Sequence, residues 1–188
     1  MGRATPTLDG LRERFAFYRR LAEGALAQVS DSAFFATLGP LDPIAIQVKH
    51  LAGNYRSRWT DFLTADGNKP DRHRDREFEL EPGDTREALM ARWAEGWRLL
   101  DDAFDSLTAD GRGDHDALAL TVTIRAQPHA VSDALFRALG HTAYHVGQIV
   151  LLAKHAAGDD WQTLSIPRGG SAAFEAEMHA RYRSPQDP

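Results

Sequence analysis

Four long stretches of this chain carry apolar residues at helical spacing, and no other feature restricts the fold as strongly. The expected helices cover about residues 8–30, Pro43 to about Ala65, Thr85 (or Asp84) to just before Gly111, and Pro128 to Gly158. In the third, apolar residues follow one another at spacings of 4, 4, 3, 4 and 3: Leu89, Trp93, Trp97, Leu100, Phe104 and Leu107. Because each apolar stripe must be buried against another element, the pattern predicts an all-α fold, a four-helix bundle.

Smaller elements are expected between and after these helices. The polar segment 66–83 is long enough to be a crossover connection rather than a tight turn. Apolar residues alternate from Leu118 to Ile124, which predicts a short strand, and Glu77–Leu80 is the partner that the pattern offers. A short helix is expected over 171–182, and 184–188 has the composition of a frayed end. No linker or repeat divides the chain, so residues 1–188 are expected to form a single domain.

Composition excludes several classes of function. The chain has no cysteine, so it contains no disulfide, thiolate metal site or cysteine nucleophile, and any thiol chemistry needs a thiol from a substrate. With 22 basic and 27 acidic residues the net charge is −5, which gives no general attraction to nucleic acid or anionic membranes. The apolar run Val146–Ala153 is too short to span a bilayer, and no signal peptide is recognisable. We therefore expect a cytoplasmic protein without nucleic-acid or membrane partners.

Histidines at helical spacing are the strongest sign of chemistry. His141 and His145 lie four residues apart on the fourth helix, so both imidazoles project from one face and can bind one ion. His50 lies on the second helix, and a facing helix can bring it to the same ion. Three neutral nitrogen ligands leave positions open for water or substrate, as in catalytic sites. The alternative is that these histidines only form hydrogen bonds with their neighbours in the bundle.

Each polar residue near these histidines allows two interpretations, one functional and one structural. Asn54, Ser57 and Asp61 follow His50 on one helical stripe nearly opposite the apolar face, which either lines a cleft or faces solvent. Asp61 is the candidate general base, or orients a ligand histidine, unless it pairs with Arg58 or a loop arginine. Gln148 either contacts a metal ligand or bonds to a neighbouring helix.

Arginines are the last group of candidates. Arg58, Arg125 and the arginines of the crossover either bind a carboxylate or phosphate group of a substrate or pair with neighbouring acidic residues.

Several motifs resemble known families. The segment His141–Ile149 (HTAYHVGQI) and the segment Lys49–Asn54 (KHLAGN) resemble the signature of the DinB-like (YfiT-like) superfamily of metalloenzymes. More narrowly, Gly53–Leu63 (GNYRSRWTDFL), parts of 66–78, and Leu164–Gly169 (LSIPRG) with Ile124-Arg125 resemble the DUF1572 branch. The resemblance covers about residues 8–178.

This resemblance implies more than the spacing does. It implies an up-down-down-up order of the four helices, a divalent metal held by His50, His141 and His145, and a homodimer. It also implies chemistry on a small-molecule substrate, because characterised relatives are transferases or isomerases that use a low-molecular-weight thiol.

Zinc or nickel is the expected ion, because imidazole does not choose sharply between them. Thiol-dependent transfer is the leading reaction and metal-assisted hydrolysis the next. The alternative is a non-enzymatic, stress-related bundle that binds a ligand or partner, with a structural or vestigial metal site.

Overall fold

The computed structural model describes residues 7–109 and 111–182, and these are mainly helical with one small sheet. The helices are α1 (Thr7–Leu26), α2 (Asp31–Phe35), α3 (Ile44–Trp59), α4 (Arg86–Thr108), α5 (Asp114–Ala119), α6 (Val131–Ala157) and α7 (Ser171–Tyr182). Two strands, β1 (Thr121–Ile124) and β2 (Gln127–Ala130), and two short 3₁₀ helices, η1 (Arg74–Phe78) and η2 (Gly158–Asp160), complete the described elements. The segment 184–188, expected to be frayed, lies outside these residues.

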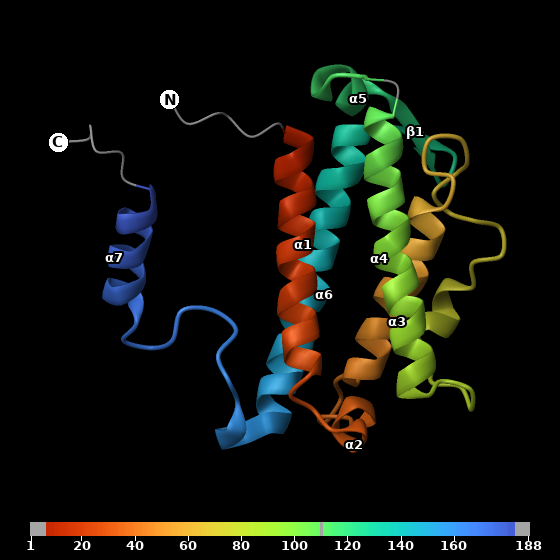
Figure 1. Ribbon diagram of the computed structural model, residues 1–188. Coiled ribbons are helices and arrows are strands. Elements are labelled where there is room, and N and C mark those ends of the chain that lie inside the picture. Colours follow the sequence, from red (N-terminus) through yellow and green to blue (C-terminus); the bar gives the residue numbers. More distant parts are fainter. Residues whose placement is uncertain (1–6, 110, 183–188) are drawn as a thin grey trace.

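The four long helices α1, α3, α4 and α6 lie side by side around a shared apolar core (Figure 1). Helix α3 packs against α4 and α6, and α1 packs against α6. The colours of Figure 1 show that α3 and α4 run in one direction, whereas α1 and α6 run in the other. A tight turn cannot join two consecutive parallel helices, so the chain returns along the bundle through residues 60–85 before α4 begins.

The apolar stripe predicted for the third helix is confirmed on α4, where every member is buried: Leu89, Trp93, Trp97, Leu100, Phe104 and Leu107. Large rings fill the space between the helices, with Tyr55 and Trp97 packed edge to face at 4.9 Å between ring centres. Gly96 permits this close approach of α3 and α4, because a Cβ at this position would lie only 3.0 Å from the Cβ of Tyr55. These contacts fix α3, which carries the first of the histidines.

Two helices end earlier than their apolar stripes predict. Helix α1 stops at Leu26, and the separate helix α2 follows, with Ser30 as its N-cap. Helix α3 stops at Trp59 instead of near Ala65, and Asp61 has a positive φ of 48°. Phe62 still reaches the core but does so from a turn, which is why the apolar pattern continues beyond the helix.

The predicted strand is present over Thr121–Ile124, but the expected pairing with Glu77–Leu80 is wrong. Strand β1 pairs antiparallel with β2, whereas Glu77 and Phe78 belong to η1. Pro128 therefore lies in a strand instead of opening the fourth helix, which begins at Val131.

The two-residue turn of this hairpin, Arg125–Ala126, has φ values of 53° and 61°. Such turns normally contain Asn or Gly, so the sequence gives no usual sign of the hairpin. Asp66 at the start of the crossover stabilises the turn, since its carboxylate accepts hydrogen bonds from the Arg125 and Ala126 N–H groups at 2.9 and 2.7 Å. The start of the crossover is thereby fastened to the hairpin.

A buried ion pair holds the far end of the crossover. Lys49 Nζ on α3 lies 2.6 Å from Asp84 Oδ2, and the two side chains are 7% and 1% exposed. Lys49 also donates to the carbonyl oxygen of Glu79 at 2.7 Å, which ties the backbone of the crossover to α3.

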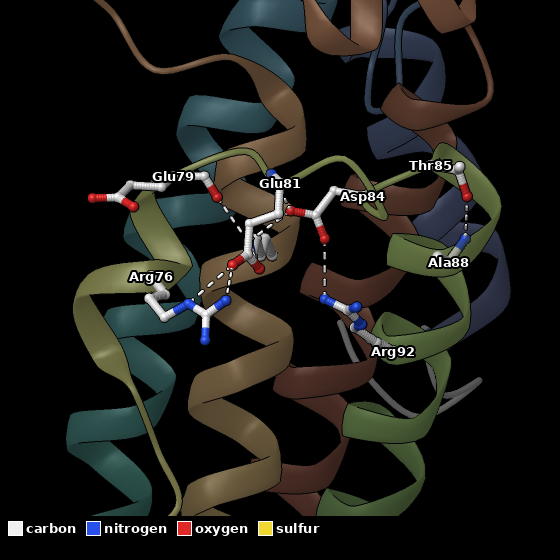
Figure 2. Close-up of polar contacts among 8 residues, drawn as sticks. Arg76, Glu79, Glu81, Asp84, Thr85, Ala88 and Arg92 are labelled. Atoms are coloured by element: carbon white, nitrogen blue, oxygen red, sulfur yellow. Dashed lines mark hydrogen bonds and ion pairs between the residues drawn. The ribbon is translucent and has the colours of Figure 1, made fainter.

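Figure 2 shows the surroundings of this pair, with Asp84 facing Arg92 of α4 and Glu81 bonded to Arg76. Thr85 accepts a hydrogen bond from the Ala88 N–H at 3.1 Å and is therefore the N-cap of α4.

Helix α7 stands apart from the bundle in Figure 1, and none of its residues is buried. Among the described helices, none combines the length and the apolar character needed to cross a membrane.

We expect Asp84→Asn to lower the free energy of unfolding by about 2 kcal/mol, because the buried Lys49 would lose its closest charged partner and keep only the partly exposed Glu81, 3.2 Å away. Urea unfolding measures this loss. Asp102→Asn is a matched control, since its ion pair with Arg98 is more than half exposed and should contribute little. A loss no larger than that of the control would contradict the prediction.

The unfolding free energy that Asp84→Asn loses should depend on pH. Burial alone would raise the pKa of Asp84, but hydrogen bonds from Lys49 and the Glu81 N–H bring it below its ordinary value of 3.8. A carboxyl group with a lowered pKa stabilises the folded state above its unfolded pKa and loses that contribution in more acidic solution. The difference between the wild type and Asp84→Asn should therefore shrink as the pH falls below 3.8.

Candidate metal centre

Three histidines from two helices meet at one point of the bundle. His50 comes from α3, and His141 and His145 come from successive turns of α6. One ring nitrogen of each lies within 4.8 Å of the others, and His50 and His145 are only 3% and 7% exposed. The stripe that carries His50 thus faces the interior of the protein at this residue rather than solvent.

Hydrogen bonds select the ring nitrogens that remain available. His50 Nδ1 lies 2.8 Å from Glu77 Oε2, and His145 Nδ1 lies 2.7 Å from Gln47 Oε1. Both oxygens act as acceptors toward these rings, so each Nδ1 carries the proton and each Nε2 keeps a free lone pair. A metal ligand has this tautomer when its other nitrogen is held by a carboxylate or amide oxygen.

The spacing of the nitrogens fits a metal ion. His50 Nε2 and His141 Nε2 are 3.1 Å apart. Two imidazole nitrogens bound to one tetrahedral zinc ion at 2.0–2.1 Å would be about 3.3 Å apart. His50 and His141 are therefore close to the spacing of two ligands of one ion, and the third nitrogen lies within 4.8 Å of theirs.

The charge state of the histidines also suits a metal. Burial, together with the neighbouring His50 and Arg72, lowers the pKa of His141 to about 4. Burial and the two other imidazoles lower the pKa of His145 to about 3. Both rings are therefore neutral at pH 7, as metal ligands must be.

Glu77 is the residue that orients His50. It lies on η1, where its carboxylate also accepts two hydrogen bonds from Arg72, at 2.8 and 2.9 Å. Burial alone would raise the pKa of Glu77, but hydrogen bonds from His50 and Arg72 bring it below its ordinary value, so the carboxylate is charged. Gly53 lets η1 approach α3 this closely, since a Cβ there would lie 2.6 Å from Glu77 Oε1.

A cavity of about 230 Å³ opens beside His50 and His141. Its walls come from α3, the crossover, the hairpin and α6. Its lining is mostly basic: Asn54, Arg58, Arg72, Arg74, Ile124, Arg125, Ala134, Arg137 and Ala138 line it together with the two histidines. A small molecule in this cavity would therefore lie next to an ion held by the histidines.

A model of the family described as "Protein of unknown function (DUF1572)" matches residues 3–170, which include every residue of this site. The chain belongs to the DUF1572 family. Comparisons with curated proteins and with solved structures found no match. The chemistry of this DUF1572 protein must therefore be argued from its own side chains.

The remaining candidate residues of the DUF1572 protein separate into two groups. Asn54, Arg58 and Arg125 line the cavity beside the histidines. Ser57 accepts a hydrogen bond from the Lys69 N–H and donates one to the Gly67 carbonyl oxygen, so it fastens the crossover to α3. Asp61 is exposed and lines a separate groove between α3, α4 and the crossover.

Gln148 is partly buried and does not line either of these two spaces.

Sequence reasoning missed several residues of this site. Gln47 lies three positions before His50 on α3, so helical spacing offered a signal that it shares the face of His50. The sequence placed Glu77 in the expected strand Glu77–Leu80 and Arg72 among the arginines of the crossover, and no local spacing links either residue to His50. Arg137 precedes His141 by one helical turn and was not considered.

We expect Glu77→Gln to weaken zinc binding by about 10- to 100-fold, because the partner of a ligand histidine fixes its tautomer and raises its basicity. Competition with a chromophoric chelator measures the affinity. Glu79→Gln is the matched control, since Glu79 is exposed and contacts Lys49 through its backbone only. Equal affinities for the two variants would show that Glu77 does not support the ligand.

Proposed function

We propose that this DUF1572 protein binds a divalent metal ion through His50, His141 and His145 and uses it to act on a small molecule. The observation that carries the proposal is the pair of contacts by which Glu77 and Gln47 occupy the Nδ1 atoms of His50 and His145. His50 Nε2 lies 3.1 Å from His141 Nε2, and one ring nitrogen of each of the three histidines lies within 4.8 Å of the others, beside a cavity that can admit a substrate. Zinc or nickel is the proposed ion, since imidazole suits both.

The resemblance to the DinB-like superfamily supports this proposal through two features. One is the histidine pattern, with one histidine on the second long helix and two at spacing four on the last. The other is the direction of the helices, since α3 and α4 run parallel to each other and opposite to α1 and α6 (Figure 1).

The chain's own contribution is to hold and shield the reacting groups. A divalent ion with an open position lowers the pKa of a bound water or thiol. Glu77 and Gln47 keep two imidazoles in the ligand tautomer, and burial keeps His141 and His145 neutral.

Transfer to a thiol is the leading reaction, and the thiol comes from a cosubstrate because the chain has no cysteine. The sulfur forms a bond to an electrophilic carbon, the leaving group departs with the electron pair of its bond, and the proton of the thiol passes to solvent. In the second candidate, hydrolysis, water takes the place of the thiol.

A non-enzymatic role is the competing proposal, and the burial of the site favours it. His50 and His145 are almost fully enclosed, and Glu77 links His50 to the crossover. An ion at this position would join α3 and α6, with η1 held to His50 by Glu77, and would stabilise the bundle without any turnover.

Tag-free wild-type protein should contain close to one divalent ion per chain, and a His141→Ala/His145→Ala variant should contain little, by elemental mass spectrometry. The loaded protein should then consume a low-molecular-weight thiol in the presence of electrophiles, and the variant should not. Little metal in the wild type even after reloading would overturn the metal proposal. A large rise in melting temperature on metal binding, without turnover of any substrate, would favour the structural role.

We further propose that two copies of the chain pair through α6. Phe136, Tyr144 and Leu151 are 57%, 67% and 66% exposed and lie on one face of this helix, nearly opposite its buried face. Gly140 and Gly147 lie between them, and a Cβ at either would meet no atom within 4 Å. Nothing within the described chain requires these glycines, whereas a second helix could approach closely there.

Tyr144→Glu/Leu151→Glu should convert a dimer into a monomer, because charges would be buried in an apolar interface. Light scattering after size-exclusion chromatography measures the mass. Arg98→Glu is a control for added negative charge, since the side chain of Arg98 on α4 is exposed. A monomeric wild type, or a dimer that survives the double substitution, would contradict this pairing.

A further inference from the structure

The cavity beside the histidines is strongly cationic. Five arginines line it, namely Arg58, Arg72, Arg74, Arg125 and Arg137, and no aspartate or glutamate is among its lining residues. They come from α3, the crossover, the hairpin turn and α6, so the fold gathers positive charge from four separate segments.

Only part of this charge is neutralised by the protein. Arg72 is paired with Glu77, and Arg74 lies 3.6 Å from the fully exposed carboxylate of Asp75. Within the described part of the chain, Arg58, Arg125 and Arg137 have no carboxylate within 4.0 Å. The chain therefore leaves three guanidinium groups without counter-ions around one small space.

Arg58 is the most unusual of the three because it is buried. Its residue is 9% exposed, and its Nη1 atom has no hydrogen-bond partner. The guanidinium lies against Gly67, where a Cβ would come within 2.8 Å of Nη1. Burial, and the repulsion of Arg137, Arg72 and Arg125, lowers the pKa of Arg58 to about 10, so the group still carries its charge at pH 7. A buried charge without a partner is costly, and a bound anion would compensate it.

The backbone of Arg125 is held in an uncommon conformation that places it at the cavity. Its φ of 53° is unfavourable for a residue with a side chain, and the Asp66 carboxylate stabilises it through the Arg125 and Ala126 N–H groups. The same crossover segment supplies Gly67, which makes room for Arg58. One short segment thus positions two of the three unpaired arginines.

The larger groove between α3, α4 and the crossover has no such charge imbalance. Its volume is about 790 Å³, and its basic residues alternate with carboxylates such as Asp61, Asp71 and Glu95. Of these two spaces, it is the cavity beside the histidines that has an excess of basic over acidic lining residues.

We propose that this cavity is an oxyanion-binding subsite, in which Arg58, Arg125 and Arg137 bind the carboxylate or phosphate group of a small substrate. Guanidinium groups match both anions through paired N–H donors. The volume of about 230 Å³ admits only a small molecule, and His50 and His141 line the same cavity as the arginines. The anionic group would hold the substrate while its reacting atom lies toward the histidines, and this second statement rests on the proposed metal function.

Calorimetric titration of inorganic phosphate, and separately of acetate, into the metal-free chain tests the subsite directly. We expect saturable binding that weakens by at least about tenfold in Arg125→Gln/Arg137→Gln, since each lost charged hydrogen bond contributes about that factor. Arg20→Gln/Arg98→Gln removes the same charge from α1 and α4, away from the cavity, and should leave the affinity within about twofold of the wild type. Tighter binding of phosphate would assign a phosphorylated substrate, and tighter binding of acetate a carboxylic acid.

The histidine variant separates this inference from the metal proposal. His145 is a candidate metal ligand that does not line the cavity. His145→Ala should therefore lose the metal and still bind the anion, whereas Arg125→Gln/Arg137→Gln should keep the metal and lose the anion. Anion binding without any metal binding would overturn the proposed function and support the subsite. No saturable binding of either anion, equal affinity in the arginine variant, or binding that disappears in the histidine variant would overturn the subsite. Arg137→Glu at the exposed edge provides a second variant, expected to abolish binding without disturbing the core.

Discussion

The carboxylate of Glu77 is the interaction on which the site depends. It accepts a hydrogen bond from His50 and two from Arg72, and all three side chains are less than 10% exposed. Each partner needs the others, because Arg72 would be an unpaired buried charge without Glu77, and His50 would lose the acceptor that fixes its tautomer. One carboxylate thus connects the candidate metal ligand, the crossover and the arginine-lined cavity.

Glu77 can do this only if the crossover is held in place at both ends. At its start, Asp66 binds the hairpin turn and Ser57 binds Gly67 and Lys69. At its end, Lys49 binds Asp84 and the Glu79 carbonyl oxygen. These contacts convert a long polar connection into a rigid wall, and a site built on a rigid support keeps its ligands in one geometry. The parallel order of α3 and α4 makes this possible, since it sends the crossover back along the bundle (Figure 1), where Glu77 contacts His50.

The sequence predicted the parts of the fold that follow from local periodicity. The stripe from Leu89 to Leu107 is buried as expected, and the spacing of His141 and His145 correctly placed both on one face. The local pattern gave a wrong helix end where tertiary contacts determine the structure. Phe62 is apolar and in phase with the stripe of the second helix, yet α3 ends at Trp59. The hairpin was missed because Asp66, 59 residues before Arg125, stabilises a turn whose own residues do not favour it. The Glu77–His50 contact has no local signal for the same reason.

Residues with an unfavourable backbone conformation and a residue with an unpaired buried charge lie together at the cavity. Their combination at one place indicates a functional site. Arg125 and Ala126 have left-handed backbones, which cost on the order of 1 kcal/mol each, and Arg58 is buried without a counter-ion beside them. Asp61 also has a positive φ, but aspartate tolerates it well, and Asp61 is exposed with no unpaired buried charge among the residues of its groove. Strain alone therefore does not mark a site in this protein. Strain that presents unpaired charge to a cavity does: Asp66 offsets the strain of the turn, whereas the buried Arg58 Nη1 has no partner, and a bound anion would recover that cost.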